Sequence, residues 1–165
     1  MRRKDREIKS IDDIFSVVER CQTVHVAMAD EKKPYVVALN FGYDRKGSDL
    51  ILYLHSACEG KKIDILRKNP LVYFQMDCAG EYIEGVPGNP CSSSWKFESV
   101  MGGGTAAFIT DESEKEHALR RILQHYSRAK DDSSPRKAAV FPAKVMENLC
   151  LWKIVSSDIT GKRHR

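Results

Sequence analysis

Residues 34–54 have the sequence PYVVALNFGYDRKGSDLILYL, and this stretch decides the fold class. Residues 34–41 are β-branched and apolar on both faces, which predicts a buried strand. Residues 44–48 have the Asp, Gly and Ser composition of a hairpin turn. Residues 50–54 are apolar again and predict the next strand. Two strands joined by so short a turn pair antiparallel, so the stretch favours an antiparallel sheet.

Apolar periodicity on either side of this hairpin predicts the remaining elements. Four further strands are expected at residues 24–28, 71–77, 94–109 and 149–155. Short helices are expected at residues 11–20, 61–68 and 111–126, the first capped by Ser10 and the last by Asp111. The strands do not alternate regularly with helices. The chain is therefore expected to be mainly β, a small antiparallel barrel or curled sheet with helices at its edges.

Two glycine-rich segments interrupt this pattern. Residues 78–93 hold three glycines and two prolines and are expected to form a long surface excursion. Gly102-Gly103-Gly104 lies within a strand, where glycine permits a bend or bulge. Gly102, Gly104 and Ala107 have the spacing of a dinucleotide-binding pattern, but no helix is expected to follow them, so the bend is the better interpretation.

Size and charge set limits on function. The 165 residues suit one domain, expected at 10–161, with a basic arm at 1–9 and a basic tail at 162–165. The net charge is +4, and each basic end carries +3, so the body between them carries −2. Such a body argues against a dedicated nucleic-acid-binding protein. No apolar run could span a membrane, and five cysteines without a CxxC pair or a signal peptide suggest a cytoplasmic protein with reduced thiols.

The segment His55-Ser56-Ala57-Cys58-Glu59-Gly60-Lys61-Lys62 is the strongest chemical signal. Lys61 and Lys62 fall in the first turn of an expected helix, where cations oppose the helix dipole. Their placement is explained if an anion binds there, because free backbone N–H groups, both ammonium groups and the Ser56 hydroxyl would converge on one phosphate. A solvated basic turn that tolerates the cost is the alternative.

Other reactive residues show no comparable pattern. His55 and Cys58 lie three residues apart, but paired zinc-binding spacings are missing, so we expect no metal site. We also find no nucleophile–base–acid triad in the sequence.

Several short motifs, in their order and spacing along nearly the whole chain, resemble one known family. They are Met1–Glu7, Pro34–Tyr43, Leu52–Ala57, Gly60-Lys61-Lys62, Asn69-Pro70, Cys91–Trp95, Ser99–Gly102 and Thr160-Gly161-Lys162. The chain resembles the pyridoxamine 5′-phosphate oxidase-like FMN-binding split barrels, in particular their nitroimidazole-resistance branch. The resemblance implies a six-stranded antiparallel split β-barrel with short flanking helices.

The resemblance also implies a cofactor site. The residues that it matches to FMN contacts are Val37, Ala38, Leu39, Asn40, His55, Ser56, Lys61, Lys62 and Ser99. Strand 37–40 would lie along the isoalloxazine ring and ribityl chain, while His55 and Ser56 would contact the flavin or its phosphate. Lys61 and Lys62 would bind the phosphate. Ser99 would lie near the flavin of the partner subunit, since members of the family are usually homodimers with FMN at the interface.

The implied activity is flavin-dependent reduction of a small nitroaromatic or another small molecule. Asn40 stands where the pyridoxamine phosphate oxidases have a lysine, and the C-terminal substrate-binding residues of those enzymes have no match, which argues against oxidation of pyridoxamine phosphate. Two alternatives stay open: a non-catalytic flavin-binding or sensing module, and a haem-binding relative of the split barrels with His55 as the ligand.

Overall fold

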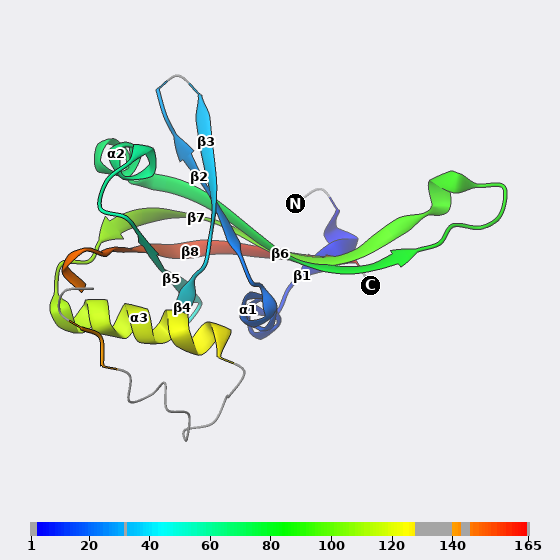
Figure 1. The fold of residues 1–165 in the computed structure, drawn as a ribbon. Coiled ribbons are helices and arrows are strands. Elements are labelled where there is room, and N and C mark those ends of the chain that lie inside the picture. The colour runs from blue at the N-terminus through cyan, green and yellow to red at the C-terminus, as the bar shows by residue number, and fades with distance from the viewer. Residues whose placement is uncertain (1–2, 32, 128–139, 143–145, 165) are drawn as a thin grey trace.

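The structure is a computed structural model that describes residues 3–31, 33–127, 140–142 and 146–164. Within these residues, eight strands form one antiparallel sheet in the order β3-β2-β6-β7-β8-β5-β4, and the short β1 pairs with β8 (Figure 1). The strands are β1 (Glu7–Ile8), β2 (Val24–Ala29), β3 (Pro34–Leu39), β4 (Gly42–Lys46), β5 (Asp49–Ser56), β6 (Leu71–Ile83), β7 (Ser94–Phe108) and β8 (Cys150–His164). This confirms a mainly β, antiparallel fold.

Three α-helices flank the sheet, as expected: α1 (Ile11–Arg20), α2 (Lys61–Lys68) and α3 (Glu112–Tyr126). Short 3-10 turns occupy Lys4–Arg6 and Pro90–Ser92. The two predicted N-caps are confirmed, because the Asp13 N–H donates to Ser10 Oγ over 3.5 Å and the Glu114 N–H donates to Asp111 Oδ1 over 2.9 Å. None of the helices in the described ranges has the length and apolar character needed to cross a bilayer.

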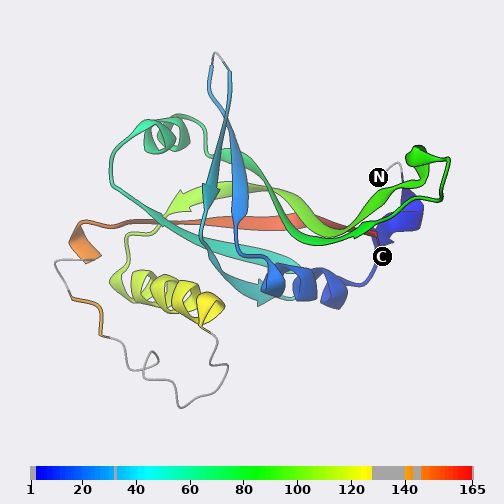
Figure 2. The same cartoon turned by 45° about the vertical axis from the view of Figure 1, so that its right-hand side comes forward.

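The sheet curls around one main core, and α3 covers a second, smaller one. The main core is built on large, fully buried side chains such as Trp152, Phe41 and Phe74, with α1 closing it on one side (Figure 2). The smaller core lies on the other face of β5 and β8, where Tyr53 and Leu151 meet α3. Burial on both faces explains why β5 has so few polar residues.

The expected count of six strands is too low, for a reason that differs from strand to strand. β1 has only two residues and β4 is mostly polar, so neither has a clear apolar pattern.

β8 is longer than expected and continues into the basic C-terminal segment, where Lys162 pairs with Glu7 of β1. The Lys162 ammonium also lies 5.3 Å from the centre of the Phe97 ring. This segment is therefore part of the sheet and not a frayed tail.

The expected excursion at residues 78–93 is largely a β-hairpin. β6 continues to Ile83 and β7 begins at Ser94, with Tyr82 opposite Trp95, so only the ten residues between the strands form a loop. This arm projects far from the body of the molecule (Figures 1 and 2). Its side chains are exposed or only partly buried, and such a strand has no apolar alternation from which to predict it.

The bend predicted at the three glycines is confirmed. The register between β7 and β8 shifts between Gly103 and Thr105, which marks a β-bulge. Ser156, a buried residue of β8, donates its hydroxyl hydrogen to the Gly103 carbonyl over 2.5 Å. The bulge therefore has a hydrogen-bond partner for its displaced carbonyl.

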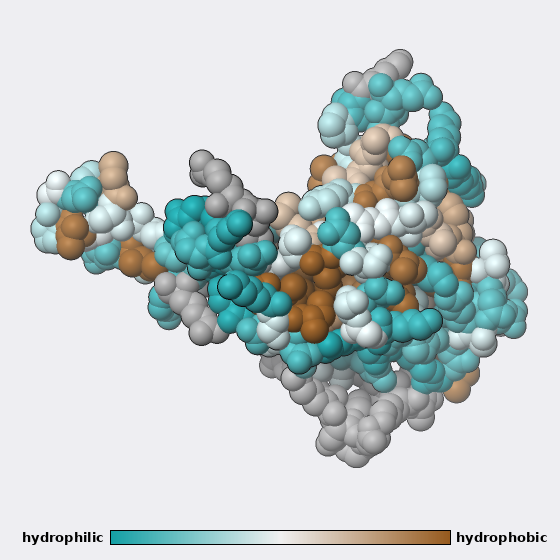
Figure 3. All heavy atoms as spheres, turned by 180° about the vertical axis from the view of Figure 1, so that it is seen from behind, coloured by the Kyte–Doolittle hydropathy of each residue, from teal (hydrophilic) through white to brown (hydrophobic). Residues whose placement is uncertain are grey.

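The outer face of the sheet keeps several apolar side chains in contact with solvent. On this face of the central part of the sheet, β3, β6, β7 and β8 carry Val36, Leu71, Tyr73, Met101 and Val155. Cross-strand pairing links several of them, because Val36 and Tyr73 both lie opposite Ala27, and Leu71 and Val155 both lie opposite Thr105. Figure 3, seen from the side opposite to Figure 1, shows apolar surface near the middle of the molecule. We call this set of side chains the outer apolar face.

Candidate functional site

The amino end of α2 has free hydrogen-bond donors. Gly60 precedes the helix with φ 116°, a conformation that favours glycine, and no side chain caps the helix. The N–H groups of Ile63 and Asp64 donate to the Gly60 carbonyl over 2.9 and 3.1 Å. The N–H groups of Lys61 and Lys62 belong to the first turn and have no carbonyl to bind within the helix. Together with the helix dipole, these donors favour an anion at this end.

Ser56 ends β5 directly before this loop, and its hydroxyl oxygen is buried. Among the described residues no hydrogen bond of normal geometry engages the Ser56 hydroxyl, which has only a looser interaction with the thiol of Cys150. Its cross-strand neighbour is Cys150, whose thiol is only a weak donor. A buried hydroxyl left unpaired costs about 1–3 kcal/mol, so a polar ligand at this position would remove a real penalty.

Lys62 is half-buried, and its charge acts on His55 and Cys150, the sequence neighbour and the cross-strand neighbour of Ser56. Burial lowers the pKa of Lys62, and no ion pair of its ammonium occurs in the described part of the chain. His55 precedes Ser56, and burial together with the Lys62 charge lowers the pKa of its imidazole. His55 is therefore neutral at pH 7. Lys62 thus supplies a positive charge, without a counter-ion among the described residues, near the end of β5 that carries Ser56.

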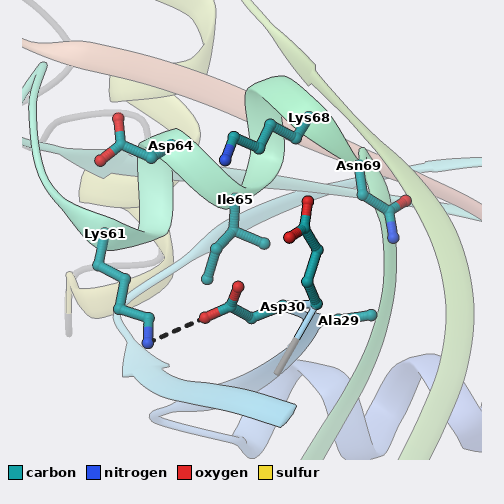
Figure 4. Close-up of a pocket in the computed structure, with 8 residues that line it drawn as sticks. Ala29, Asp30, Lys61, Asp64, Ile65, Lys68 and Asn69 are labelled. Atoms are coloured by element: carbon teal, nitrogen blue, oxygen red, sulfur yellow. Dashed lines mark ion pairs between the residues drawn. The ribbon is translucent and has the colours of Figure 1, made fainter. Parts of the chain in front are cut away.

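Lys61 points elsewhere (Figure 4). Its ammonium forms an ion pair with Asp30 Oδ2 at 3.0 Å and lies 5.0 Å from the centre of the Tyr35 ring. The hydrogen bond from Lys61 lowers the pKa of Asp30. Successive residues of a helix point about 100° apart, so Lys61 and Lys62 diverge. The two ammonium groups do not converge on one point, because Asp30 holds Lys61 at the β2–β3 hairpin.

A pocket of 390 Å³ lies between this hairpin and α2. It is lined by Ala29, Asp30, Glu31, Lys61, Asp64, Ile65, Lys68 and Asn69. Figure 4 shows Lys61 and Asp30 facing each other across one side of it. Carboxylates and ammonium groups both line this pocket, so its charges largely offset each other. The amino end of α2 is therefore the better candidate for binding an anion.

Strand β3, which carries the predicted flavin contacts, is an edge strand of the sheet. Val37 and Leu39 pack against the main core, while Ala38 and Asn40 are exposed on the other side. The contact between Lys61 and Tyr35 joins the beginning of β3 to α2. The Lys61 side chain therefore links α2 to the core-facing side of β3, whereas Ala38 and Asn40 lie on the opposite side of that strand.

Ser99 lies apart from this region within the chain. It is on β7, with Asp77 of β6 and Lys162 of β8 as its cross-strand neighbours. It lies two residues before Met101 on β7, on the same side of the sheet as the outer apolar face.

The sequence gives no indication of three residues that shape the site. Asp30 lies in an ordinary charged turn, and Tyr35 resembles any other strand aromatic. Cys150 reaches Ser56 only through the β5–β8 register, which joins positions 94 residues apart. To predict that Cys150 lies beside Ser56, one would need the register of the β5–β8 pair. Apolar alternation along the two strands does not fix that register.

Known proteins with this fold share its main features. A solved structure from Bacteroides thetaiotaomicron, described as a candidate 5-nitroimidazole antibiotic resistance protein, is 32% identical, covers 95% of this chain and 86% of its own, and superposes with a TM-score of 0.77. A flavocytochrome from Azotobacter vinelandii is 18% identical, with coverage of 100% and 72% and a TM-score of 0.78. An FAD- and haem-binding protein from Mycobacterium smegmatis is 13% identical, with coverage of 97% and 74% and a TM-score of 0.77.

The last two similarities concern the fold alone. No curated protein sequence matches the chain significantly. The sequence profile of the pyridoxamine 5′-phosphate oxidase family, in contrast, matches residues 10–163, which include every element from α1 to β8. The chain therefore belongs to the pyridoxamine 5′-phosphate oxidase family and is similar to the nitroimidazole-resistance protein of Bacteroides thetaiotaomicron.

Proposed function

We propose that the chain binds FMN without a covalent bond and uses it as an oxidoreductase of the nitroimidazole-reductase type. One observation carries this proposal: the segment from Ser56 to Lys62 brings together a buried hydroxyl without a good hydrogen bond, an uncapped helix end and a lysine without an ion pair among the described residues. The donors fit a phosphate dianion, which accepts several hydrogen bonds and favours a helix N-terminus. Family membership and the flavin-binding names of two structural neighbours support the same cofactor class.

In this proposal each part of the site has a distinct role. Ser56, Lys62 and the first N–H groups of α2 bind the phosphate, and Lys61 adds its charge when it leaves Asp30. The exposed side of β3, with Ala38 and Asn40, lies along the ring, where the small Ala38 leaves room for a flat ligand. The bound flavin would supply the redox chemistry. His55, neutral at pH 7, is able to accept a proton beside it.

The proposed functional unit is a homodimer with FMN at the interface. The outer apolar face is the surface that supports this, because monomeric proteins rarely leave so many large apolar side chains of one sheet exposed. Ser99 lies on the same side of the sheet, where it could reach the flavin of the partner subunit.

The proposed substrate is a small nitroaromatic compound. The name of the Bacteroides protein, which is 32% identical, motivates this choice. Within this chain we assign no catalytic acid or base, and the proton that accompanies reduction comes from water, directly or through His55.

An absorbance spectrum of the purified protein, followed by a titration with FMN, tests the cofactor. We expect the absorbance bands of a bound flavin and quenching of FMN fluorescence. Turnover of a nitroimidazole with NAD(P)H then tests the activity. Protein that stays colourless and does not quench FMN contradicts the proposal, while flavin that binds but never turns over favours a sensing module.

A second candidate function is haem binding, which His55 specifically favours. Its imidazole is neutral, which leaves a ring nitrogen able to bind a metal, and the side chain is accessible enough for a ligand to reach it. Two structural neighbours are named as a flavocytochrome and as an FAD- and haem-binding protein. Reconstitution with haem gives a Soret band that is lost in His55→Ala if this reading is right, whereas FMN quenching without a Soret band supports the flavin.

A further inference from the structure

Cys21 and Cys78 bring two thiols from separate elements into contact. Their sulfur atoms are 3.4 Å apart, although 57 positions separate them in the sequence. Cys21 ends α1, and its N–H donates to the Val17 and Val18 carbonyls over 3.1 and 3.2 Å. Cys78 lies on β6, on the same face as the buried Phe74 and Met76. The contact is therefore held by a helix end on one side and a central strand on the other.

The two thiols differ in their exposure. Cys21 is fully buried, while Cys78 is partly accessible to solvent. Burial raises the pKa of the Cys21 thiol, and the hydrogen bond with the Cys78 thiol raises it further. A dissolved oxidant therefore reaches the Cys78 thiol first. The Cys21 thiol stays protonated and lies deeper in the core, in contact with Cys78.

The geometry is close to that of a disulfide. The sulfur atoms of a disulfide are 2.03–2.05 Å apart, so the two must approach by about 1.4 Å. The backbone of α1 at Cys21 is at a helix end and that of β6 at Cys78 lies just before a register shift that follows Ala79. Both are places where a small side-chain rotation is possible without breaking a ladder of hydrogen bonds.

We propose that Cys21 and Cys78 are a redox-active dithiol, which a peroxide converts to an intrachain disulfide. The Cys78 thiolate attacks one peroxide oxygen, the O–O bond breaks, and a sulfenic acid forms while hydroxide leaves and is protonated to water. The Cys21 sulfur then attacks the Cys78 sulfur, an S–S bond forms, and the S–O bond breaks. The Cys21 proton leaves with that oxygen as a second water. Two thiols are oxidised and one hydrogen peroxide is reduced.

The other three cysteines provide internal controls. Cys91 is exposed in the loop of the arm, and no sulfur contact of its thiol occurs within the described residues. The Cys58 thiol donates to the Asn148 carbonyl over 3.5 Å, and Cys150 lies beside Ser56 and near enough to Cys58 for their charges to interact. Among the described residues, however, the only sulfur–sulfur contact is the one between Cys21 and Cys78. Peroxide is therefore expected to join one specific pair among ten possible ones.

The bond would tie the end of α1 to β6 at the base of the arm. It would close a loop of 57 positions, and such a cross-link restricts the unfolded chain. We expect the oxidised protein to have a thermal midpoint higher by about 5–15 °C than the reduced protein.

The experiment uses the full-length protein, reduced and then treated with hydrogen peroxide in the folded state. Free thiols are blocked, the chain is digested without reduction, and the peptides are identified by mass spectrometry. We expect one linked peptide pair that contains Cys21 and Cys78, with the loss of two hydrogen atoms. Cys91→Ser is the matched control and must give the same linked pair, while Cys78→Ser must give none.

Because Cys21 is buried, its replacement would destabilise the fold. The proposal is therefore decided by the peptide map of the wild-type protein. A linked pair that contains Cys58, Cys91 or Cys150 in place of Cys21 and Cys78 overturns the proposal. So does oxidation of Cys78 to a sulfinic acid while Cys21 stays a free thiol. Neither outcome depends on whether the protein binds a flavin.

Discussion

Lys62 has no carboxylate partner among the described residues of the candidate site, whereas Lys61 is paired with Asp30. We predict that Lys62→Ala weakens FMN binding by about 1–3 kcal/mol, or about 5- to 150-fold, as for a lost hydrogen bond to a charged group. Fluorescence titration with FMN measures the change. Lys68→Ala is the control, because Lys68 lies in the last turn of α2, where a cation favours the helix dipole. The double change with Lys61→Ala should weaken binding further, and unchanged affinity in the double variant removes the phosphate assignment.

Asp30 is the residue that competes with a phosphate for Lys61. We predict that Asp30→Asn strengthens FMN binding about two- to fivefold, because it frees the Lys61 ammonium from a partly exposed ion pair. The same titration checks this. In a Lys61→Ala background the gain should vanish, since the freed charge is then missing. A gain of equal size in that background would show that Asp30 acts on the ligand by itself.

At the scale of elements, the three glycines of β7 are not equivalent. A Cβ at Gly102 would lie 2.7 Å from the Phe74 ring and 2.9 Å from the Asp158 carbonyl oxygen, and one at Gly104 would lie 2.7 Å from the Val155 carbonyl oxygen. At Gly103 the nearest atom is Tyr73 Cδ2, at an ordinary 3.6 Å. We predict that Gly102→Ala and Gly104→Ala each lower the free energy of unfolding by about 1–3 kcal/mol.

Urea unfolding measures these three variants, with Gly103→Ala as the internal control within about 0.5 kcal/mol of the wild type. The bend itself could be predicted from the sequence, because three glycines inside a strand have no other common role. Which of them face the core could not, because this depends on the register with β6 and β8. Equal losses in all three variants would show that backbone flexibility, and not steric contact, decides the stability of β7.

The same distinction separates what the sequence could and could not predict elsewhere. The caps at Ser10 and Asp111 are local patterns, and both are present. The arm between β6 and β7 is stabilised by strand pairing in a solvated setting, and pairing between distant residues leaves no local pattern. The divergence of Lys61 and Lys62 has the same origin, since Asp30 approaches Lys61 only once β2 and α2 are in place.

At the scale of the whole molecule, the outer apolar face determines whether the site is complete in one chain. In a single chain this face leaves Leu71 64% and Tyr73 48% exposed, whereas a second copy would remove that area from water. A carboxylate buried in such an interface without a partner has a large desolvation cost. A substitution that places one there should therefore separate the subunits and leave each fold intact.

We predict that Leu71→Glu converts the proposed dimer to a monomer and weakens FMN binding at least tenfold in the same step, because each flavin would lose the partner's contacts. Sedimentation velocity over a range of protein concentrations gives the subunit state, and FMN titration of the same samples gives the affinity. Leu123→Glu on α3 is the matched control, since Leu123 is also an exposed leucine but lies away from the outer apolar face. A Leu71→Glu protein that stays dimeric with full FMN affinity contradicts the interface, while a folded monomer with full affinity shows that one chain alone holds the flavin.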